Sequence, residues 1–441
     1  MSKRDRVRAN LRGAWEAARV AWAPVFDAER LTALRDRRLR HMVAHAYTRV
    51  PYYRRLFDQA GVRPEELRSA ADLARIPVTC KADLRRIPID ERVASGTQID
   101  RCLHLRSSGT SGEPFSVYWN VGGYSVFLAL TVRALRMAGA RPTDTLMVVG
   151  PGYYPEGLLI QRLGIGKVRS LSPLLEPAAL ADAIETARPD VLHAYGSVLK
   201  CLVRLACDTG RTLYRPRVIV SSADYLEEGT RRECADLMGV APIQMYGAVE
   251  TGRIGNECWL RDGLHIFTDF VVPELIPLED DPAVRRVVLT DLTNFTMPFL
   301  RYDQGDLAEV VDGPCGCGRA FPRIRLVAAR ASDVVRLPTG AAVSALRLGA
   351  PLWQAPSVDA FKIVQESAAR VVVKVVRRDG HEGGGIQAAV AAVASFLPGM
   401  SVELELVDSI APNPSGKVSQ FASPSSEPGP SGLSHTQVHR P

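Results

Sequence analysis

The feature that most constrains this fold is a regular alternation of short apolar runs with longer helical segments, which begins near Leu103. The helical segments span about a dozen residues or more, whereas the runs are short and rich in β-branched residues. The runs read FSVYW, TLMVVG, VLHAYG, RVIVSS and PIQMYG. Such alternation predicts an α/β architecture with a mainly parallel sheet.

The regions before and after this alternation have different residue patterns. Helical periodicity extends to about residue 90, and VPYYRRLF at Val50–Phe57 ends one helix and opens another. Residues 269–311 read as a β-rich part without helices. After Arg330 come two β-type runs, a glycine-rich turn, an alanine-rich helix and a last strand, which predict a small α+β unit. We therefore expect a large domain over 1–330, a small mobile C-terminal α+β domain over 331–421, and a disordered tail over 422–441.

The composition is that of a soluble globular protein with a large core. Of 441 residues, 46% are hydrophobic and 23% are charged, so the apolar content is ample for folding. We expect no transmembrane helix, because the chain has no run of about 18 uncharged apolar residues. We also expect no secretory signal, because the N-terminus lacks the apolar stretch of a signal peptide. Eight cysteines without such a signal favour a reducing compartment over a disulfide framework, and therefore the cytoplasm.

The positive charge is concentrated at the N-terminus. Residues 1–40 carry eleven basic and five acidic side chains, so six of the seven net positive charges lie there. A nucleic-acid or membrane arm is one interpretation. A solvated helical face is the favoured one, because aromatic and leucine residues recur in this segment at roughly helical spacing. We therefore expect neither a nucleic acid nor a membrane as a partner.

A Ser/Gly-rich loop, SSGTSGEP, precedes the run FSVYW. Glycines permit backbone torsions that let successive N–H groups converge on an anion, and hydroxyl groups add donors. The spacing is not that of a P-loop, which needs Gly-Lys-Ser/Thr before a helix. By itself this loop is compatible with a phosphate cradle or with a plain surface turn.

A separate set of residues has the chemistry of a metal site. Cys258 and His265 flank the turn in CWLRDGLH, and Cys315 and Cys317 follow in GPCGCGR. Three thiolates and one imidazole make a complete tetrahedral set for structural Zn²⁺. The alternative is free cysteines in turns. The other five cysteines lie on apolar or helical segments and are interpreted as core residues.

Further motifs follow the loop in a fixed order. QMYGAVET occurs at Gln244–Thr251, FLRYDQGD at Phe299–Asp306, AARASD near residue 330 and PNPSGK at Pro412–Lys417. With AHAYTRVPYYRRLFDQAGV and IPVTCKADL near the start, the chain resembles the adenylate-forming (ANL) enzymes, specifically their phenylacetate–CoA ligase branch. The resemblance spans roughly residues 40–420. Members of this branch often carry a similar Cys/His set and are often dimers.

The resemblance implies roles for individual residues. Glu250 would hold the Mg²⁺ that bridges phosphate oxygens, Tyr246 would lie near the adenine, and Asp306 would accept the ribose hydroxyls. Lys417 would act as a catalytic residue with Glu250, by reaching the α-phosphate as charge develops. The remaining nucleotide-binding residues implied by the resemblance are Ser107, Ser108, Gly109, Thr110, Ser111, Gly112, Gly247, Thr251 and Arg330.

The enzymes of this branch favour aromatic acids as substrates. Three segments of the chain usually line their acyl pocket. Here they read GPGYYPEG, HAYGS and SSAD. Aromatic side chains there suit an apolar slot. The absence of an arginine from these segments disfavours a dicarboxylic acid. The candidate substrate residues are Tyr153, Tyr154, Tyr195, Ser222 and Ala223.

Two positions depart from the family pattern. Glu113 stands where a basic residue usually follows the loop, so backbone donors, hydroxyls and Mg²⁺ would have to hold the phosphates. Ser332 stands at the usual hinge position, which leaves the CoA half-reaction less supported than adenylation.

We therefore expect an ATP- and Mg²⁺-dependent ligase that converts an aryl carboxylic acid to acyl-AMP and then to a CoA thioester. One alternative keeps adenylation but changes the acceptor or the acid, to an amine, a carrier-protein thiol or nitrite. A second alternative is an inactive nucleotide-binding scaffold. Retention of Glu250, Asp306 and Lys417 together disfavours the scaffold.

Overall fold

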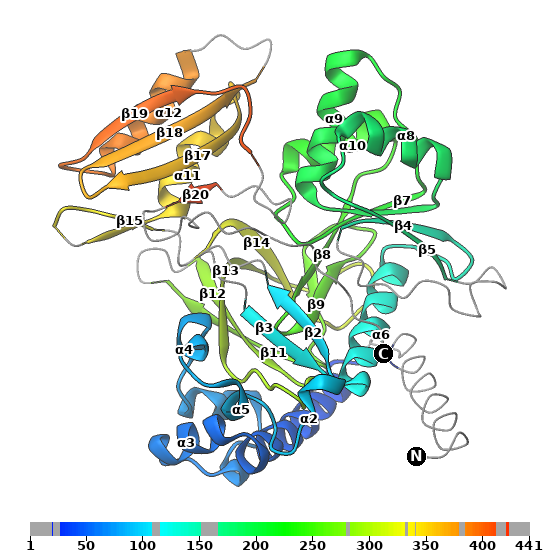
Figure 1. Ribbon diagram of the computed structural model, residues 1–441, viewed down its shortest axis with the longest axis vertical. Coiled ribbons are helices and arrows are strands. Elements are labelled where there is room, and N and C mark those ends of the chain that lie inside the picture. Colours follow the sequence, from blue (N-terminus) through cyan, green and yellow to red (C-terminus); the bar gives the residue numbers. More distant parts are fainter. Residues whose placement is uncertain are drawn as a thin grey trace. The chain divides into compact units, whose positions relative to one another are not determined.

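The computed structural model describes two compact units (Figure 1). The larger unit holds the described residues up to Leu105 and from Val117 to Arg330. The smaller unit holds residues 106–107 and 115–116 and the described residues from 334 onward. The described residues are 20, 27–107, 115–150, 166–278, 283–330, 334–339, 341–378, 384–411 and 420–422.

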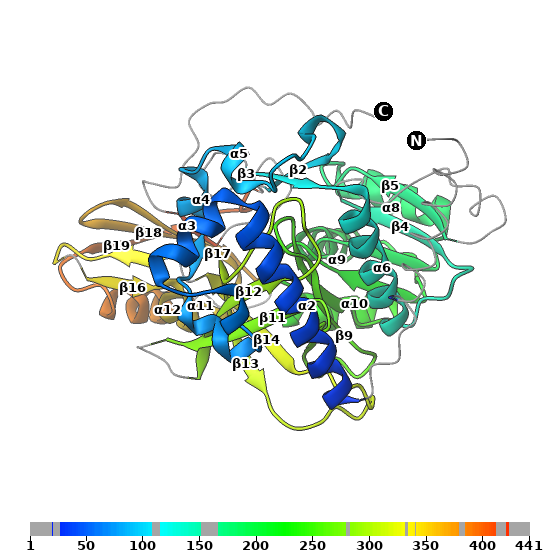
Figure 2. The same ribbon diagram turned by 90° about the horizontal axis from the view of Figure 1, so that it is seen from below.

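Two helices open the described part of the larger unit and lie side by side in Figure 2. They are α2 (Ala28–Arg49) and α3 (Pro51–Ala60). The Asp27 carboxylate caps α2 by accepting from the backbone N–H of Arg30 at 3.0 Å, and a proline opens α3. Both features favour helix initiation. The break predicted within VPYYRRLF is confirmed.

Four of the five predicted runs, TLMVVG, VLHAYG, RVIVSS and PIQMYG, lie in the parallel half of the main sheet, whose order is β5-β4-β6-β7-β8. The prediction is wrong for FSVYW, which lies in a separate two-stranded sheet. All four pairings between neighbouring strands of the parallel half are parallel. Their bounds are β4 Thr145–Val149, β5 Lys167–Leu171, β6 Val191–Ala194, β7 Val218–Ser221 and β8 Ile243–Ala248.

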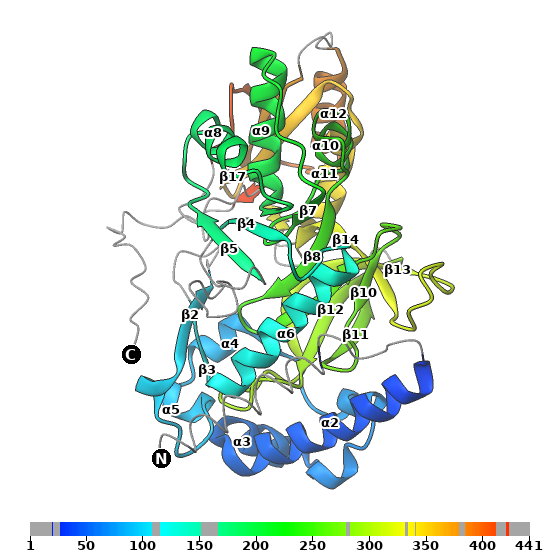
Figure 3. The same ribbon diagram turned by 90° about the vertical axis from the view of Figure 1, so that its right-hand side faces the viewer.

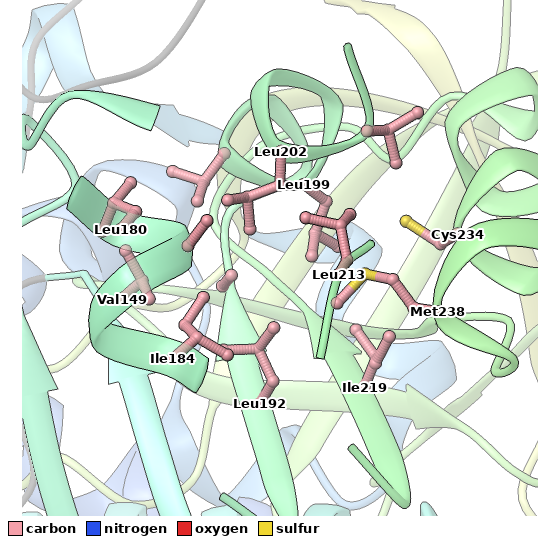
Figure 4. Packing of buried hydrophobic residues seen from close by; sticks show 14 of the residues in the cluster. Val149, Leu180, Ile184, Leu192, Leu199, Leu202, Leu213, Ile219, Cys234 and Met238 are labelled. Carbon is pink, nitrogen blue, oxygen red and sulfur yellow. The ribbon is translucent and has the colours of Figure 1, made fainter. Parts of the chain in front are cut away.

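Helices cover both faces of this parallel half. On one face, α8 (Pro177–Ala187), α9 (Gly196–Thr209) and α10 (Glu228–Met238) bury a core that contains Leu199, Leu202 and Ile219 (Figure 4). On the other face lies α6 (Val121–Met137), which also runs beside β9 (Figure 3). Side chains of successive strand residues point to opposite faces, which explains why these strands are apolar throughout.

The second half of the sheet is antiparallel and continues the path as β9-β10-β14-β13-β12-β11. Its strands are β9 Gly252–Glu257, β10 Leu264–Ile266, β11 Val271–Pro277, β12 Val284–Asp291, β13 Tyr302–Val311 and β14 Arg323–Arg330. The short β1 (Thr79–Cys80) pairs in parallel with β13 and leads into α4 (Lys81–Arg85). Shorter elements of the described chain are α5 Ile89–Arg92, a separate pair β2 Leu103–Ser107 and β3 Phe115–Trp119, and 3-10 turns at Pro64–Glu66, Ala70–Arg75 and Ile99–Arg101.

A buried ion pair joins α6 to the connection between β10 and β11. Arg133 donates through Nη1 to both carboxylate oxygens of Asp269 at 2.9 Å, and the two side chains are only 4% and 3% exposed. Its Nε and Nη2 donate to the Val20 carbonyl at 3.0 and 2.7 Å. Because both charges are buried, each depends on the other for compensation.

The smaller unit contains a mixed sheet in the order β19-β18-β17-β20 and an antiparallel pair, β15-β16. Its apolar core includes Phe361, Val373 and Val393. The elements are β15 Val334–Arg336, β16 Ala342–Ser344, α11 Ala345–Gln354, β17 Val358–Ser367, β18 Arg370–Arg377, α12 Gly384–Ser395, β19 Ser401–Leu406 and β20 Phe421–Ala422.

The α/β fold class, with a parallel half, a β-rich part and a separate smaller α+β unit, is confirmed. The prediction that five cysteines are core residues is wrong for most of them. Cys234 is buried, Cys80 and Cys102 are partly exposed, and Cys201 and Cys207 lie on the exposed side of α9. None of the helices in the described ranges is long and apolar enough to span a bilayer.

Candidate nucleotide-binding and metal sites

The predicted site residues are described only in part. Ser107 ends β2 and Arg330 ends β14. The phosphate loop, two substrate tyrosines and the C-terminal lysine lie outside the described residues. They are Ser108, Gly109, Thr110, Ser111, Gly112, Tyr153, Tyr154 and Lys417.

The structure brings Tyr246 and Asp306 together from different strands. The Tyr246 hydroxyl, at the end of β8, donates to Asp306 Oδ2 on β13 at 2.7 Å. The same hydroxyl accepts from Gln304 Nε2 at 2.9 Å, and the Thr251 hydroxyl donates to Gln304 Oε1 at 2.9 Å. Gln304 therefore ties two predicted nucleotide-binding residues to the aspartate, and the chain of hydrogen bonds fixes their side chains.

Glu250 lies in the turn between β8 and β9 and is only 4% exposed. Its Oε1 forms an ion pair with Lys81 Nζ at 2.8 Å and accepts from the Tyr302 hydroxyl at 3.3 Å. Burial is the main cause that raises the pKa of Tyr302, followed by the charge of Glu250. The tyrosine therefore stays protonated and remains a donor to the carboxylate.

Lys81 is a site residue that the sequence interpretation missed. It opens α4 immediately after β1, and β1 is held on β13 by the pairings Thr79↔Tyr302 and Cys80↔Asp303. The Thr79 backbone N–H also donates to the Arg301 carbonyl at 2.9 Å. This short strand delivers the ammonium group to Glu250. Its segment, IPVTCKADL, was already part of the family resemblance, and that was the available signal.

The predicted substrate residues of the described chain lie at the carboxyl ends of β6 and β7. Tyr195 follows β6 and its ring would lie 3.2 Å from a Cβ placed on Gly150. Ser222 Oγ lies 2.6 Å from His193 Nε2. Ala223 has a φ of 75°, a left-handed conformation that is strained for alanine. Ligands of open α/β sheets bind at such carboxyl ends.

Cys258, His265, Cys315 and Cys317 meet at one point, as their types predicted. All four side chains are buried, and their donor atoms lie within 4.8 Å of one another. Cys258 Sγ is 3.7 Å from Cys315 Sγ, and Cys317 Sγ is 3.5 Å from His265 Nε2. A tetrahedron with Zn–S bonds of about 2.3 Å and a Zn–N bond of about 2.0 Å has edges of about 3.8 and 3.5 Å. The donor spacing therefore fits zinc.

The protonation chemistry differs between the members of this cluster. Burial is the main cause that raises the pKa of Cys258 to about 12, whereas the pKa values of His265 and Cys317 are lowered. Burial is the main cause that lowers the pKa of His265 to about 4, with the charges of Arg319 and Arg323 next, so the imidazole is neutral and able to ligate. Burial acts to raise the pKa of Cys317, but hydrogen bonds from Arg319 and the neighbouring thiols outweigh it and lower that pKa. Among the residues that the structure describes, buried His265 Nδ1 has no hydrogen-bond partner, and Nε2 is the ring nitrogen that lies next to Cys317 Sγ.

Chemically, the described residues provide two buried or half-buried acidic groups with different surroundings. Glu250 is paired with a cation and a hydroxyl, which suits exchange for a hard metal ion. Asp306 accepts from the Tyr246 hydroxyl through Oδ2, and an ionised carboxylate is a group that can accept several hydroxyl donors at once. This division matches the roles that the resemblance implied for a metal-bridged phosphate and for a ribose.

The amino-acid sequence is similar to those of known CoA ligases. No family model matches the chain. A phenylacetate–coenzyme A ligase of Thermus thermophilus is 33% identical over 323 residues, which cover 70% of this chain and 72% of that protein. The Escherichia coli phenylacetate–coenzyme A ligase is 30% identical over 327 residues, with 70% and 72% covered.

Solved structures share the fold at lower identity. A 2-hydroxyisobutyryl-CoA ligase in the postadenylation state aligns with a TM-score of 0.70 and 20% identity over 91% of both chains. An anthranilate CoA ligase in complex with anthranoyl-AMP aligns with a TM-score of 0.54 and 16% identity over 74% of this chain and 66% of that one.

Proposed function

Because this chain belongs to the phenylacetate–coenzyme A ligase family of adenylate-forming enzymes, we propose that it activates an aryl carboxylic acid with ATP and transfers the acyl group to CoA. In the first step a carboxylate oxygen of the acid attacks the α-phosphorus and pyrophosphate leaves. In the second, the CoA thiol attacks the acyl carbon, loses its proton and expels AMP. Positioning and charge stabilisation carry such a reaction, because no covalent bond to the protein is needed.

The observation that supports this proposal most is the pair of carboxylates in the turn after β8 and within β13. Asp306, oriented by the Tyr246 hydroxyl at 2.7 Å, would bind the ribose hydroxyls. Glu250 would hold Mg²⁺, which neutralises phosphate charge when bound. Lys81, 2.8 Å from Glu250, compensates that carboxylate in the free enzyme.

The remaining assignments complete the same site. The phosphate loop Ser107–Gly112 would surround the β- and γ-phosphates, with Gly247, Thr251 and Arg330 also contributing to nucleotide binding. The proposed domains are a large one over 1–330 and a small one over 331–421, and Lys417 would act on the α-phosphate. Tyr153, Tyr154, Tyr195, Ser222 and Ala223 would contact the acid.

We also propose that Cys258, His265, Cys315 and Cys317 hold a structural Zn²⁺. The support is that four buried donors lie within 4.8 Å of one another, that the Cys258–Cys315 and Cys317–His265 separations match two edges of the zinc tetrahedron, and that the imidazole is neutral. The ion would tie the end of β9, the strand β10 and the β13–β14 connection together, because the ligands lie on these segments. Four protein ligands close the coordination sphere, so this metal would not take part in catalysis.

The test is pyrophosphate release from ATP and Mg²⁺ with aryl acids, short fatty acids and nitrite, each with and without CoA. We expect release with an aryl acid and a CoA thioester when CoA is present. Release without thioester would move the proposal to another acceptor. Lys417→Ala should slow release by about 10²–10³-fold, because one group that stabilises transition-state charge is lost. Full activity of this variant would refute the assignment of Lys417.

A further inference from the structure

A cluster of polar side chains lies between α6, β6 and β9, beside the proposed acid-binding residues. It consists of Thr131 on α6, His193 on β6, Ser222 after β7 and Arg253 on β9. His193 and Ser222 form a hydrogen bond, and the guanidinium of Arg253 donates a hydrogen bond to the Thr131 hydroxyl. A polar cluster on an otherwise apolar sheet face requires an explanation, because buried polar groups are costly without a purpose or a partner.

Arg253 is held with its guanidinium directed to the segment that carries Tyr246 and Glu250. Its Nε and Nη2 each lie 3.3 Å from the Thr131 hydroxyl. Its Nη1 lies 3.2 Å from the position that a Cβ on Gly247 would occupy. A larger residue at position 247 would collide with the Gly252 carbonyl oxygen, 2.7 Å from that Cβ position, and would press on this arginine. The contacts place a permanent positive charge immediately behind the Tyr-Gly pair.

The charge of Arg253 acts on the neighbouring His193. Burial is the main cause that lowers the pKa of His193 to about 3, and the charge of Arg253 adds to it. The imidazole is therefore neutral at physiological pH and serves as a hydrogen-bonding group for Ser222. Arg253 is half-buried, and a guanidinium in such a place interacts more strongly with an anion than it would in water.

Aromatic rings of α6 and its preceding strand complete the lining. The Arg253 guanidinium carbon lies 5.4 Å from the centre of the Phe127 ring. Phe127 stacks on Tyr124 with centroids 5.6 Å apart and contacts Trp119 at 6.2 Å. Aromatic faces next to one fixed cation suit a ring that bears an oxygen substituent.

Building on the proposed function, we infer that Arg253 is a specificity-determining residue, which selects an aryl acid with a second oxygen acceptor remote from the reacting carboxylate. The acceptor is a ring hydroxyl or a second carboxylate, bound by charge-assisted hydrogen bonds from the guanidinium. The absence of an arginine, which disfavoured a dicarboxylic acid, holds for the three segments GPGYYPEG, HAYGS and SSAD. Arg253 belongs to a fourth, β9, which the fold brings to the same place.

The experiment compares phenylacetate, 4-hydroxyphenylacetate and 4-carboxyphenylacetate as substrates for pyrophosphate release. Each is measured with the wild-type chain, Arg253→Met and Arg253→Lys, with Arg30→Met as a matched control, because Arg30 is an exposed arginine on α2. We expect the wild type to favour an oxygen-substituted acid by about tenfold or more in kcat/KM. Arg253→Met should abolish this preference chiefly through KM, Arg253→Lys should retain part of it, and the control should leave it unchanged.

The arms separate the outcomes. If Arg253→Met lowers kcat/KM more for 4-carboxyphenylacetate than for 4-hydroxyphenylacetate, the substrate is a dicarboxylic acid. If it lowers kcat/KM more for 4-hydroxyphenylacetate, the substrate is a phenol. A preference that Arg253→Met leaves unchanged within twofold, or a wild type that prefers phenylacetate, overturns the inference. If no acid releases pyrophosphate, the proposed function fails instead. Calorimetric titration of the substituted acids then decides on Arg253 alone, since binding lost in Arg253→Met supports its role and equal or absent binding refutes it.

Discussion

Replacing Arg133 with methionine should destabilise the larger unit strongly, although this residue is not part of the proposed active site. The methionine fills much of the same volume but leaves Asp269 buried without the guanidinium that donates to both of its oxygens. The Val20 carbonyl loses two donors in the same substitution. The free energy of unfolding should therefore fall because a charge is left buried, rather than because a cavity forms.

The expected size follows from the surroundings of the carboxylate. Removing one partner of a buried ion pair costs about 3–5 kcal/mol. Two charges about 4 Å apart at an effective dielectric of about 20 interact by about 4 kcal/mol, which agrees. Arg38 Nη1 remains 3.9 Å from Asp269 Oδ2 and offsets part of the loss. We therefore expect about 3 kcal/mol, and at about 2 °C per kcal/mol for a unit this large, a melting temperature lower by about 6 °C.

The assay is urea and thermal unfolding of the wild type, Arg133→Met, Asp269→Asn and the double variant. The double variant removes both formal charges, so it should recover most of the loss seen in Arg133→Met. A cost below about 1 kcal/mol for Arg133→Met, or a double variant no more stable than that single one, would refute the reasoning. The first result would mean that water reaches Asp269, and the second that packing dominates.

Three further predictions concern the sites. Cys315→Ala should reduce bound zinc in elemental analysis and lower the melting temperature, whereas an equally stable wild type after chelation, with no metal detected, would remove the zinc proposal. Because the folded-state pKa of His193 lies below its unfolded value of about 6.5, stability should fall as the pH drops from about 6.5 toward 3; His193→Gln should flatten this part of the pH–stability curve, and an unchanged curve would contradict it. Lys81→Met should lower stability by about 1–3 kcal/mol by leaving Glu250 buried without its ammonium partner, and Glu250→Gln in that background should restore it in the same unfolding assay.

The sequence predicted the strands and the family because both signals are local. The run TLMVVG became β4, PIQMYG became β8, and RRVVLTDLT became β12, since β-branched residues in short apolar runs fit buried strands. The order of the short motifs along the chain was sufficient to identify the family. The meeting of Cys258, His265, Cys315 and Cys317 was also predictable, because a Cys/His pair and a Cys/Cys pair in glycine-containing segments are distinctive even when they lie about fifty residues apart in the chain.

The missed features depend on contacts between segments far apart in the chain. Lys81 reaches Glu250 only because β1 joins the edge of β13, and Arg253 reaches Thr131 only because α6 packs beside β9. No local pattern encodes either approach. The wrong prediction for the cysteines has a different cause. Cys201 and Cys207 lie on a helix that was recognised from its apolar residues, but both cysteines lie on the exposed side of that helix. The domain limits and the roles of the undescribed loop and lysine stay predictions.

The pairing of β1 with β13 has a consequence for biosynthesis. Thr79 and its partner Tyr302 are 223 residues apart (302 minus 79), and a ribosome adds about 5–20 residues per second. The N-terminal helices therefore leave the ribosome about 11–45 s before the strand that accepts β1 has been made. Tyr53 and Phe57 of α3, which are buried in the finished protein, lack part of their packing during this interval, since their cluster includes Leu292 and Leu300. The nascent chain must be shielded from aggregation for that time, and Tyr246 can meet Asp306 only after β13 has been made.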